Sequence, residues 1–117
     1  MPNPIIVYRV EHETKLFGPL CTEGSEFLNL EWCEVAKHHD SIDTYPECMD
    51  YLGGEIPENF KFGMASEELL LNLFREGMSQ NIQDRGFVIR KYETEDYTTA
   101  PDGQVCYNSE TAKEYHG

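Results

Sequence analysis

Long hydrophobic runs are absent from this 117-residue sequence. No segment approaches the roughly 18 consecutive apolar residues that are typical of a membrane-spanning helix. The first four residues, Met1 to Pro4, also lack the basic and apolar regions of a secretory signal. These absences argue against a membrane protein and against secretion, and we expect a cytoplasmic protein that has no membrane partner.

The common catalytic signatures are missing as well. The sequence has no Gly-x-Ser-x-Gly elbow, Walker loop, His-Glu-x-x-His helix or Cys-x-x-Cys pair, and these are the strongest sequence signals of an enzyme. The lack of a glycine-rich phosphate loop also argues against a doubly wound nucleotide-binding fold. The sequence therefore favours a protein without catalytic activity.

Basic residues are scarce. Nine Lys and Arg stand against 22 Asp and Glu, which gives a net charge of −13. The excess is concentrated in residues 1–60, which hold twelve acidic residues and three basic ones. Such a surface repels nucleic acid phosphates and attracts basic protein surfaces, so we expect no direct nucleic acid binding. An acidic surface can also serve solubility alone.

The four cysteines show no closely spaced pair. Without a secretory signal, they are expected to be reduced thiols in small buried positions. A zinc site could be assembled from Cys21, Cys33, His38 or His39, and Cys48. Because no Cys-x2–4-Cys knuckle brings two ligands together, this pattern is weak, and we expect no metal.

Apolar patterning predicts several short elements. Residues 5–10 are β-branched and aromatic, which indicates a strand buried on both faces at the centre of a sheet. Ser66 is a good N-cap for a helix that carries Leu69, Leu70 and Leu73 on one face and that Gly77 ends or kinks. Gly86 is the expected left-handed cap. The remaining elements are predicted as a helix over 26–37, irregular chain over 38–59, strands over 60–65, 87–92 and 104–107, a polar loop over 93–103 and a final helical turn over 109–114.

The order of these elements predicts an α+β fold. We expect one small domain over residues 1–117, with a mixed or antiparallel sheet and two to three short helices. Within it, residues 20–60 form an acidic, loop-rich segment, and a long loop in a compact domain is usually functional or mobile.

Three groups of residues could carry chemistry. Arg9 at the end of the first strand could contact an anionic ligand beside His12, or form an ion pair with one of the many acids. Ser66 could add a hydroxyl to an anion site at a helix N-terminus, or simply cap that helix. The run from His38 to Asp40, with Asp43, could bind a metal or serve as acid and base, or form solvated turns.

Four stretches, "VYRVEH", "FGMASEELLLNLF", "RGFVIRKYE" and "GQVCYN", together resemble a group of small proteins encoded by tailed bacteriophages and prophages. Their order is also similar to that of minimal ADP-ribosyltransferase-like folds. This second resemblance implies that Arg9 contacts the phosphates of NAD, that Ser66 is the serine of the second motif, and that Gln104 occupies the position of the catalytic glutamate. A glutamine there departs from the family pattern, and nothing in the spacing marks Glu93 or Glu95 as its substitute.

Two functional hypotheses follow, beside the possibility of an accessory protein whose acidic surface serves solubility. In the first, a phage-type acidic protein uses no cofactor and binds and inhibits a basic host protein, such as a nucleic-acid-binding defence system of the CRISPR or restriction type. In the second, the chain is an NAD-using enzyme or a degenerate NAD-binding relative. The oligomeric state stays open. For the first hypothesis the predicted contact residues are acidic: Glu23, Glu26, Glu31, Glu34, Asp40 and Asp43.

Overall fold

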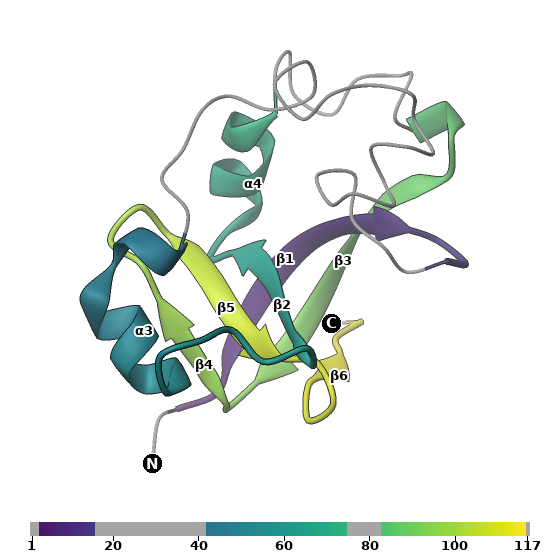
Figure 1. Ribbon diagram of the computed structural model, residues 1–117. Helices are drawn as coiled ribbons and strands as arrows, with labels where there is room; N and C mark the ends of the chain where they lie inside the picture. Colours follow the sequence, from purple (N-terminus) through teal and green to yellow (C-terminus); the bar gives the residue numbers. More distant parts are fainter. Residues whose placement is uncertain (1–2, 16–41, 75–82, 117) are drawn as a thin grey trace.

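Six antiparallel strands form one curled sheet in the order β4-β5-β2-β1-β3-β6. A computed structural model describes residues 3–15, 42–74 and 83–116 (Figure 1). The strands are β1 (Ile5–His12), β2 (Phe60–Met64), β3 (Phe87–Thr94), β4 (Tyr97–Thr99), β5 (Gln104–Asn108) and β6 (Lys113–Glu114), and the helices are the 3-10 turn η1 (Ile42–Thr44), α3 (Pro46–Leu52) and α4 (Glu67–Leu73). The predicted α+β class is confirmed, and the sheet is antiparallel.

Strand β1 lies at the centre of the sheet, as its sequence predicts. It pairs with β3 over eight residues and meets β2 at Tyr8 and Met64. The strand continues two residues further than predicted, through Glu11 and His12, and both of these polar residues are buried. Sequence patterning ended the strand before them because charged residues usually mark solvent.

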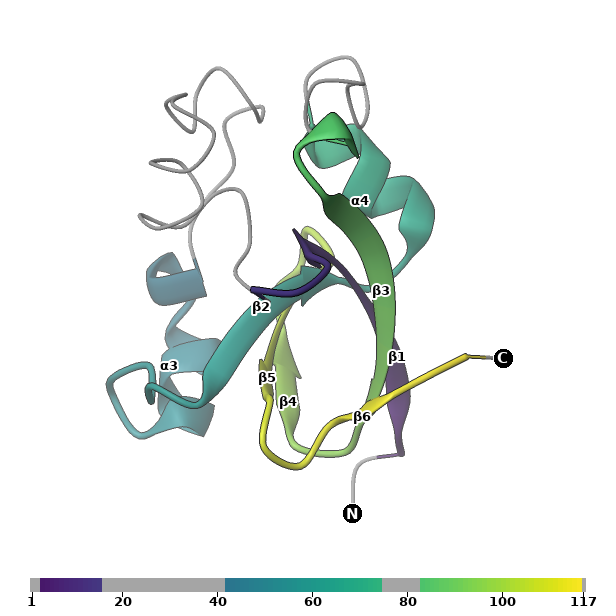
Figure 2. The ribbon, with the colours of Figure 1, turned by 90° about the vertical axis from the view of Figure 1, so that its right-hand side faces the viewer.

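The two helices cover one face of the sheet. On this outer face, Leu70 and Phe74 pack against Val10, Met64 and Phe87 at one end. At the other end, Cys48 of α3 packs with Ile42, Ala100 and Cys106. The side chains of the inner face form a separate core of Val7, Val105 and Tyr107. Figure 2 shows how the sheet curls around this inner face while α3 and α4 stay outside it.

Helix α4 begins where the sequence predicts. The hydroxyl of Ser66 accepts a hydrogen bond from the backbone N–H of Leu69 at 3.2 Å, which satisfies one free donor of the first turn. The helix ends at Leu73, since Phe74 is already extended, which is earlier than the predicted end or kink at Gly77; Gly77 itself lies outside the described residues. Gly86 has φ +88°, which confirms the predicted left-handed position.

Two predicted irregular segments contain regular structure. Residues 46–52 form α3, with Pro46 at its first position and the left-handed Gly53 (φ 82°) at its end. Proline at a helix start and glycine just past its end are ordinary helix signals, but the six residues between them are too few to show a helical period. Strand β4 likewise lies within the predicted loop over 93–103. The sequence does not predict it, because three residues are too few to show the alternation of a strand.

The predicted final helix is wrong. Residues 109–111 form a turn, and Lys113 and Glu114 form β6 against Tyr92 and Glu93 of β3. The turn is organised by Asn108, whose side chain accepts from the N–H of Glu110 at 3.0 Å. Asparagine favours such turns over helix because its amide competes for backbone groups. The predicted helix over 26–37 lies outside the described residues, and no helix within them is long and apolar enough to span a membrane.

Candidate functional site

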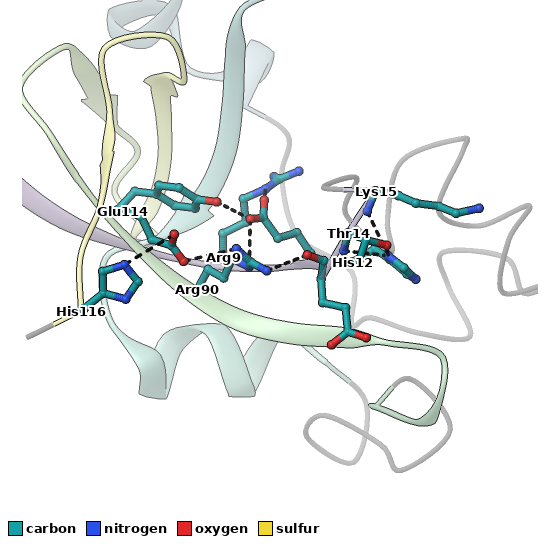
Figure 3. Close-up of polar contacts among 10 residues, drawn as sticks. Arg9, His12, Thr14, Lys15, Arg90, Glu114 and His116 are labelled. Carbon is teal, nitrogen blue, oxygen red and sulfur yellow. Dashed lines mark hydrogen bonds and ion pairs between the residues drawn. The ribbon is translucent and has the colours of Figure 1, made fainter.

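A charged cluster built around the buried Glu11 joins strands β1, β3 and β6. It consists of Arg9 and Glu11 of β1, Arg90 and Tyr92 of β3, and Glu114 of β6, and is called the arginine–glutamate cluster below. Arg9 and Arg90 stand opposite each other in the ladder. Val7, Arg9 and Glu11 are spaced two residues apart along β1, so their side chains lie on the same face of the sheet. Val7 belongs to the inner core, and the strand residues of the cluster therefore project to the inner side of the curl. Figure 3 shows these contacts.

Glu11 is the centre of this cluster, and only 1% of its side chain is exposed. One carboxylate oxygen, Oε2, lies 3.0 Å from Nε of Arg9. The other, Oε1, accepts a short hydrogen bond from the hydroxyl of Tyr92 and lies 3.5 Å from Nε of Arg90. A buried carboxylate is tolerated when it is paired and hydrogen-bonded in this way.

The two guanidinium groups also bind backbone carbonyls. Nη1 of Arg9 donates to the carbonyl of Phe62 at 2.8 Å, and so connects β1 to β2 next to the Tyr8–Met64 pair. Nη2 of Arg90 donates to the carbonyl of Glu13 at 2.7 Å, and its Nη1 lies 3.2 Å from Glu114. The cluster therefore holds four strands together.

The tyrosines of this face, Tyr92 and Tyr107, both have a raised pKa. Desolvation and the hydrogen bond to Glu11 both raise the pKa of Tyr92. Desolvation raises the pKa of Tyr107 to about 12. Two guanidinium groups balance two carboxylates, and both oxygens of Glu11 are engaged. This arrangement links the strands of the sheet, and each carboxylate oxygen of Glu11 already has a cationic or hydroxyl partner.

The residues assigned to NAD do not all meet. Met64 stands opposite both Tyr8 and Gln104, so Gln104 and Tyr8 share one face of the sheet. Arg9 follows Tyr8 and projects from the other face. Arg9 and Gln104 thus lie on opposite faces, while Ser66 caps α4. The sequence allows Arg9 either to contact an anionic ligand or to form an ion pair, and the structure shows an ion pair with Glu11. The NAD hypothesis stays a prediction, and it requires a different arrangement of these residues.

His12 is separated from Arg9 too. It lies on the face of Tyr8, is 8% exposed, and packs edge-on against Phe87 with ring centroids 5.6 Å apart. Arg9 and His12 therefore lie on opposite faces of the sheet and do not form the single site that the sequence suggested.

An acidic surface lies around α3. Of the predicted contact residues, Asp43 is described and exposed, whereas Glu23, Glu26, Glu31, Glu34 and Asp40 lie outside the described residues, as do His38 and His39. Residues 42–60, called the α3 acidic segment, contain no Lys, Arg or His. Their exposed acids are Asp43, Glu47, Asp50, Glu55 and Glu58. Of these five acids, the sequence analysis predicts only Asp43 as a contact residue. The absence of basic residues over this stretch is the sequence feature that points to the other four.

One aromatic side chain stands within this segment. Tyr51 is 47% exposed, and its hydroxyl donates to Oδ1 of Asp96 at 2.6 Å. That hydrogen bond is the main reason why the pKa of Tyr51 is raised. The second oxygen of Asp96 accepts from the amide of Asn108 at 3.0 Å, so the end of α3 is fixed to the sheet.

The described cysteines are buried. Cys48 and Cys106 are both free and inaccessible in the core beneath α3, and burial raises the pKa of Cys106 to about 12. Among the described residues no group of three or more His, Cys, Asp and Glu could hold a metal ion. Cys21 and Cys33, the other cysteines of the zinc alternative, lie outside those residues.

Comparison with known proteins identifies the family of the chain. A model of the bacteriophage T4 Y00F protein family matches residues 1–116. The chain belongs to this family. No curated protein and no solved structure matches it. The Y00F family is a phage family, which confirms the predicted resemblance to phage proteins, whereas the likeness to ADP-ribosyltransferases has no support in these comparisons.

Proposed function

We propose that this Y00F-family protein acts without catalysis, in the cytoplasm of the host bacterium, by binding a basic protein surface. The observation that carries the proposal is the α3 acidic segment, in which five exposed acids stand in nineteen residues without one basic residue. Opposite charges steer association and set specificity more than they add affinity. The exposed ring of Tyr51 supplies the kind of aromatic contact that interfaces favour.

The charge distribution supports this assignment of the binding side. Two of the basic residues of β3 and β6 lie beside acids: Arg90 contacts Glu114, and Lys113 stands opposite Glu93 in the ladder. The α3 acidic segment has no such compensation within itself. The negative charge of the segment is therefore not balanced by basic residues of its own.

The partner class follows from the charge of the segment. A protein surface that binds nucleic acid is basic over an extended area, because it neutralises several phosphates. We propose that the α3 acidic segment occupies such a surface on a host protein and blocks its access to nucleic acid. An inhibitor of a nucleic-acid-cleaving defence system, of the CRISPR or restriction type, fits this description.

Matched charge variants test the proposal. The first, Asp50→Asn/Glu55→Gln/Glu58→Gln, neutralises the α3 acidic segment but keeps Glu47 in the first turn of α3. The second, Glu93→Gln/Glu95→Gln/Glu110→Gln, removes three exposed acids elsewhere. Each immobilised protein is exposed to host lysate at about 50 mM and about 500 mM NaCl, which changes the screening length several-fold. Captured proteins are identified and quantified by mass spectrometry.

We expect the wild type and the second variant to capture the same basic, nucleic-acid-binding proteins at low salt. The first variant should lose them, high salt should release them, and added double-stranded DNA should compete for them. A purified captured protein should also bind less DNA in the presence of the wild type. Equal capture by both variants, or no capture at low salt, would contradict the proposal.

A further inference from the structure

The ring of His12 organises the turn that follows the central strand. Its Nδ1 accepts hydrogen bonds from the backbone N–H groups of Thr14 at 3.2 Å and Lys15 at 3.1 Å, and it lies 3.2 Å from the hydroxyl of Thr14 (Figure 3). A ring nitrogen that receives two N–H groups cannot carry a proton itself. The observed turn therefore requires the neutral imidazole with its proton on Nε2.

The imidazole also has little room to move. The side chain is buried and packs edge-on against Phe87. A Cβ atom added to Gly86 would lie 3.0 Å from Nε2, so the backbone of Gly86 closes off that side of the ring. The N–H of Glu13 donates to the carbonyl of Gly86 at 2.8 Å, which fixes the turn beside the ring. A simple rotation of His12 would lose these contacts.

We propose that His12 is a pH-sensitive switch that binds the backbone of Thr14 and Lys15 when it is neutral and releases it when it is protonated. Protonation would place an N–H of Nδ1 against the N–H groups of Thr14 and Lys15. The two hydrogen bonds from these N–H groups would then be lost together, whereas the hydroxyl of Thr14 can accept from a protonated Nδ1. Unperturbed histidine changes charge between pH 5 and 8, so acidification across this range is the condition that tests the device.

Charged residues of both signs occupy the two described segments beside the ring. Glu13 and Lys15 belong to the turn itself, and Asp84 and Arg85 precede Gly86 on the segment leading into β3. Glu11 and Arg90 project to the opposite face of the sheet. The release depends on the hydrogen bonds that Nδ1 accepts from Thr14 and Lys15. This inference is independent of the proposed binding function.

Amide exchange followed by NMR tests the switch on the full chain. Protection factors of Thr14 and Lys15, corrected for intrinsic exchange, are measured from about pH 8 to about pH 5 while the ring signal of His12 is followed. His116, whose side chain is 79% exposed and whose Nε2 lies 3.6 Å from Glu114, is followed in the same spectra as an exposed ring. We expect both protection factors to fall by roughly tenfold as His12 protonates, the scale of one lost hydrogen bond.

A variant supplies the matched control. In His12→Asn the side-chain oxygen can accept in place of Nδ1 but does not titrate, so both amides should stay protected across the whole range. Protection that persists in the wild type down to pH 5, or an unchanged pH dependence in His12→Asn, would overturn the proposal. If His12→Asn fails to fold, the wild-type titration still decides, because it compares the ring and the amides of the same molecule.

Discussion

Glu11 is the single residue on which the arginine–glutamate cluster depends. Replacing it by Gln removes the only carboxylate that contacts Arg9 in the cluster, and it leaves Arg90 with Glu114 alone. A buried charge that loses its partner is costly. We expect Glu11→Gln to lower the free energy of unfolding by about 3 kcal/mol, measured by urea denaturation.

Glu13 offers the matched control for this change. It is exposed, and its contact with Arg90 uses the backbone carbonyl, which a side-chain substitution leaves in place. Glu13→Gln carries the same change of charge two residues along the same strand end. It should alter the free energy of unfolding by less than about 0.5 kcal/mol. Equal effects of the two substitutions would mean that the cluster contributes nothing beyond the general charge.

Tyr92 makes the stability of the cluster depend on alkaline pH. Its pKa is raised by desolvation and by the hydrogen bond to Glu11, so the folded protein holds this proton more tightly than the unfolded chain. The stabilisation is present below the unfolded pKa of about 10 and is lost as pH rises above it. We expect the wild type to lose stability steadily above that pH, and Tyr92→Phe to start lower at pH 8 and to decline less. Melting temperatures across this range measure both, and parallel curves would contradict the expectation.

Helix α4 provides the test at the scale of an element. Its seven residues start at the Ser66 cap, and short helices depend strongly on their ends. Ser66→Ala should lower the free energy of unfolding by about 1 kcal/mol, whereas Ser66→Asp, which can accept the same hydrogen bond, should restore it. If Ser66 instead held NAD, millimolar NAD would raise the melting temperature of the wild type and not that of Ser66→Ala. We expect no such shift in either protein.

The elements that the sequence predicts well are those with a strong local signal. The apolar run of β1, the Ser66 cap and the left-handed Gly86 each determine their backbone within a few residues. Strands β4 and β6 have two or three residues and owe their conformation to β5 and β3. No local pattern encodes such pairing, because β propensity depends on the neighbouring strand.

The candidate sites follow the same division. The excess of acids predicts an ion pair for Arg9. It does not identify the partner, because a charged residue at a strand end such as Glu11 is expected to be exposed to solvent. Burial of Glu11 results from three partners, two of which lie about 80 residues away on β3. The acidic character of residues 42–60 is a property of composition and could be predicted in full, whereas the α3 helix that presents part of it could not.

The net charge of −13 acts on the molecule as a whole. Mutual repulsion among exposed acids destabilises the compact state, and salt screens it over about 10 Å at 0.1 M. The buried pairs of the arginine–glutamate cluster are screened much less, so they should not reverse the effect. We expect the melting temperature to rise between about 20 mM and about 200 mM NaCl. The variant Asp50→Asn/Glu55→Gln/Glu58→Gln, with three fewer negative charges in the α3 acidic segment, should melt higher at low salt and gain less from added salt. Salt would thus stabilise the free protein while weakening the proposed complex, and a melting temperature that falls with salt would show that attractive surface pairs dominate instead.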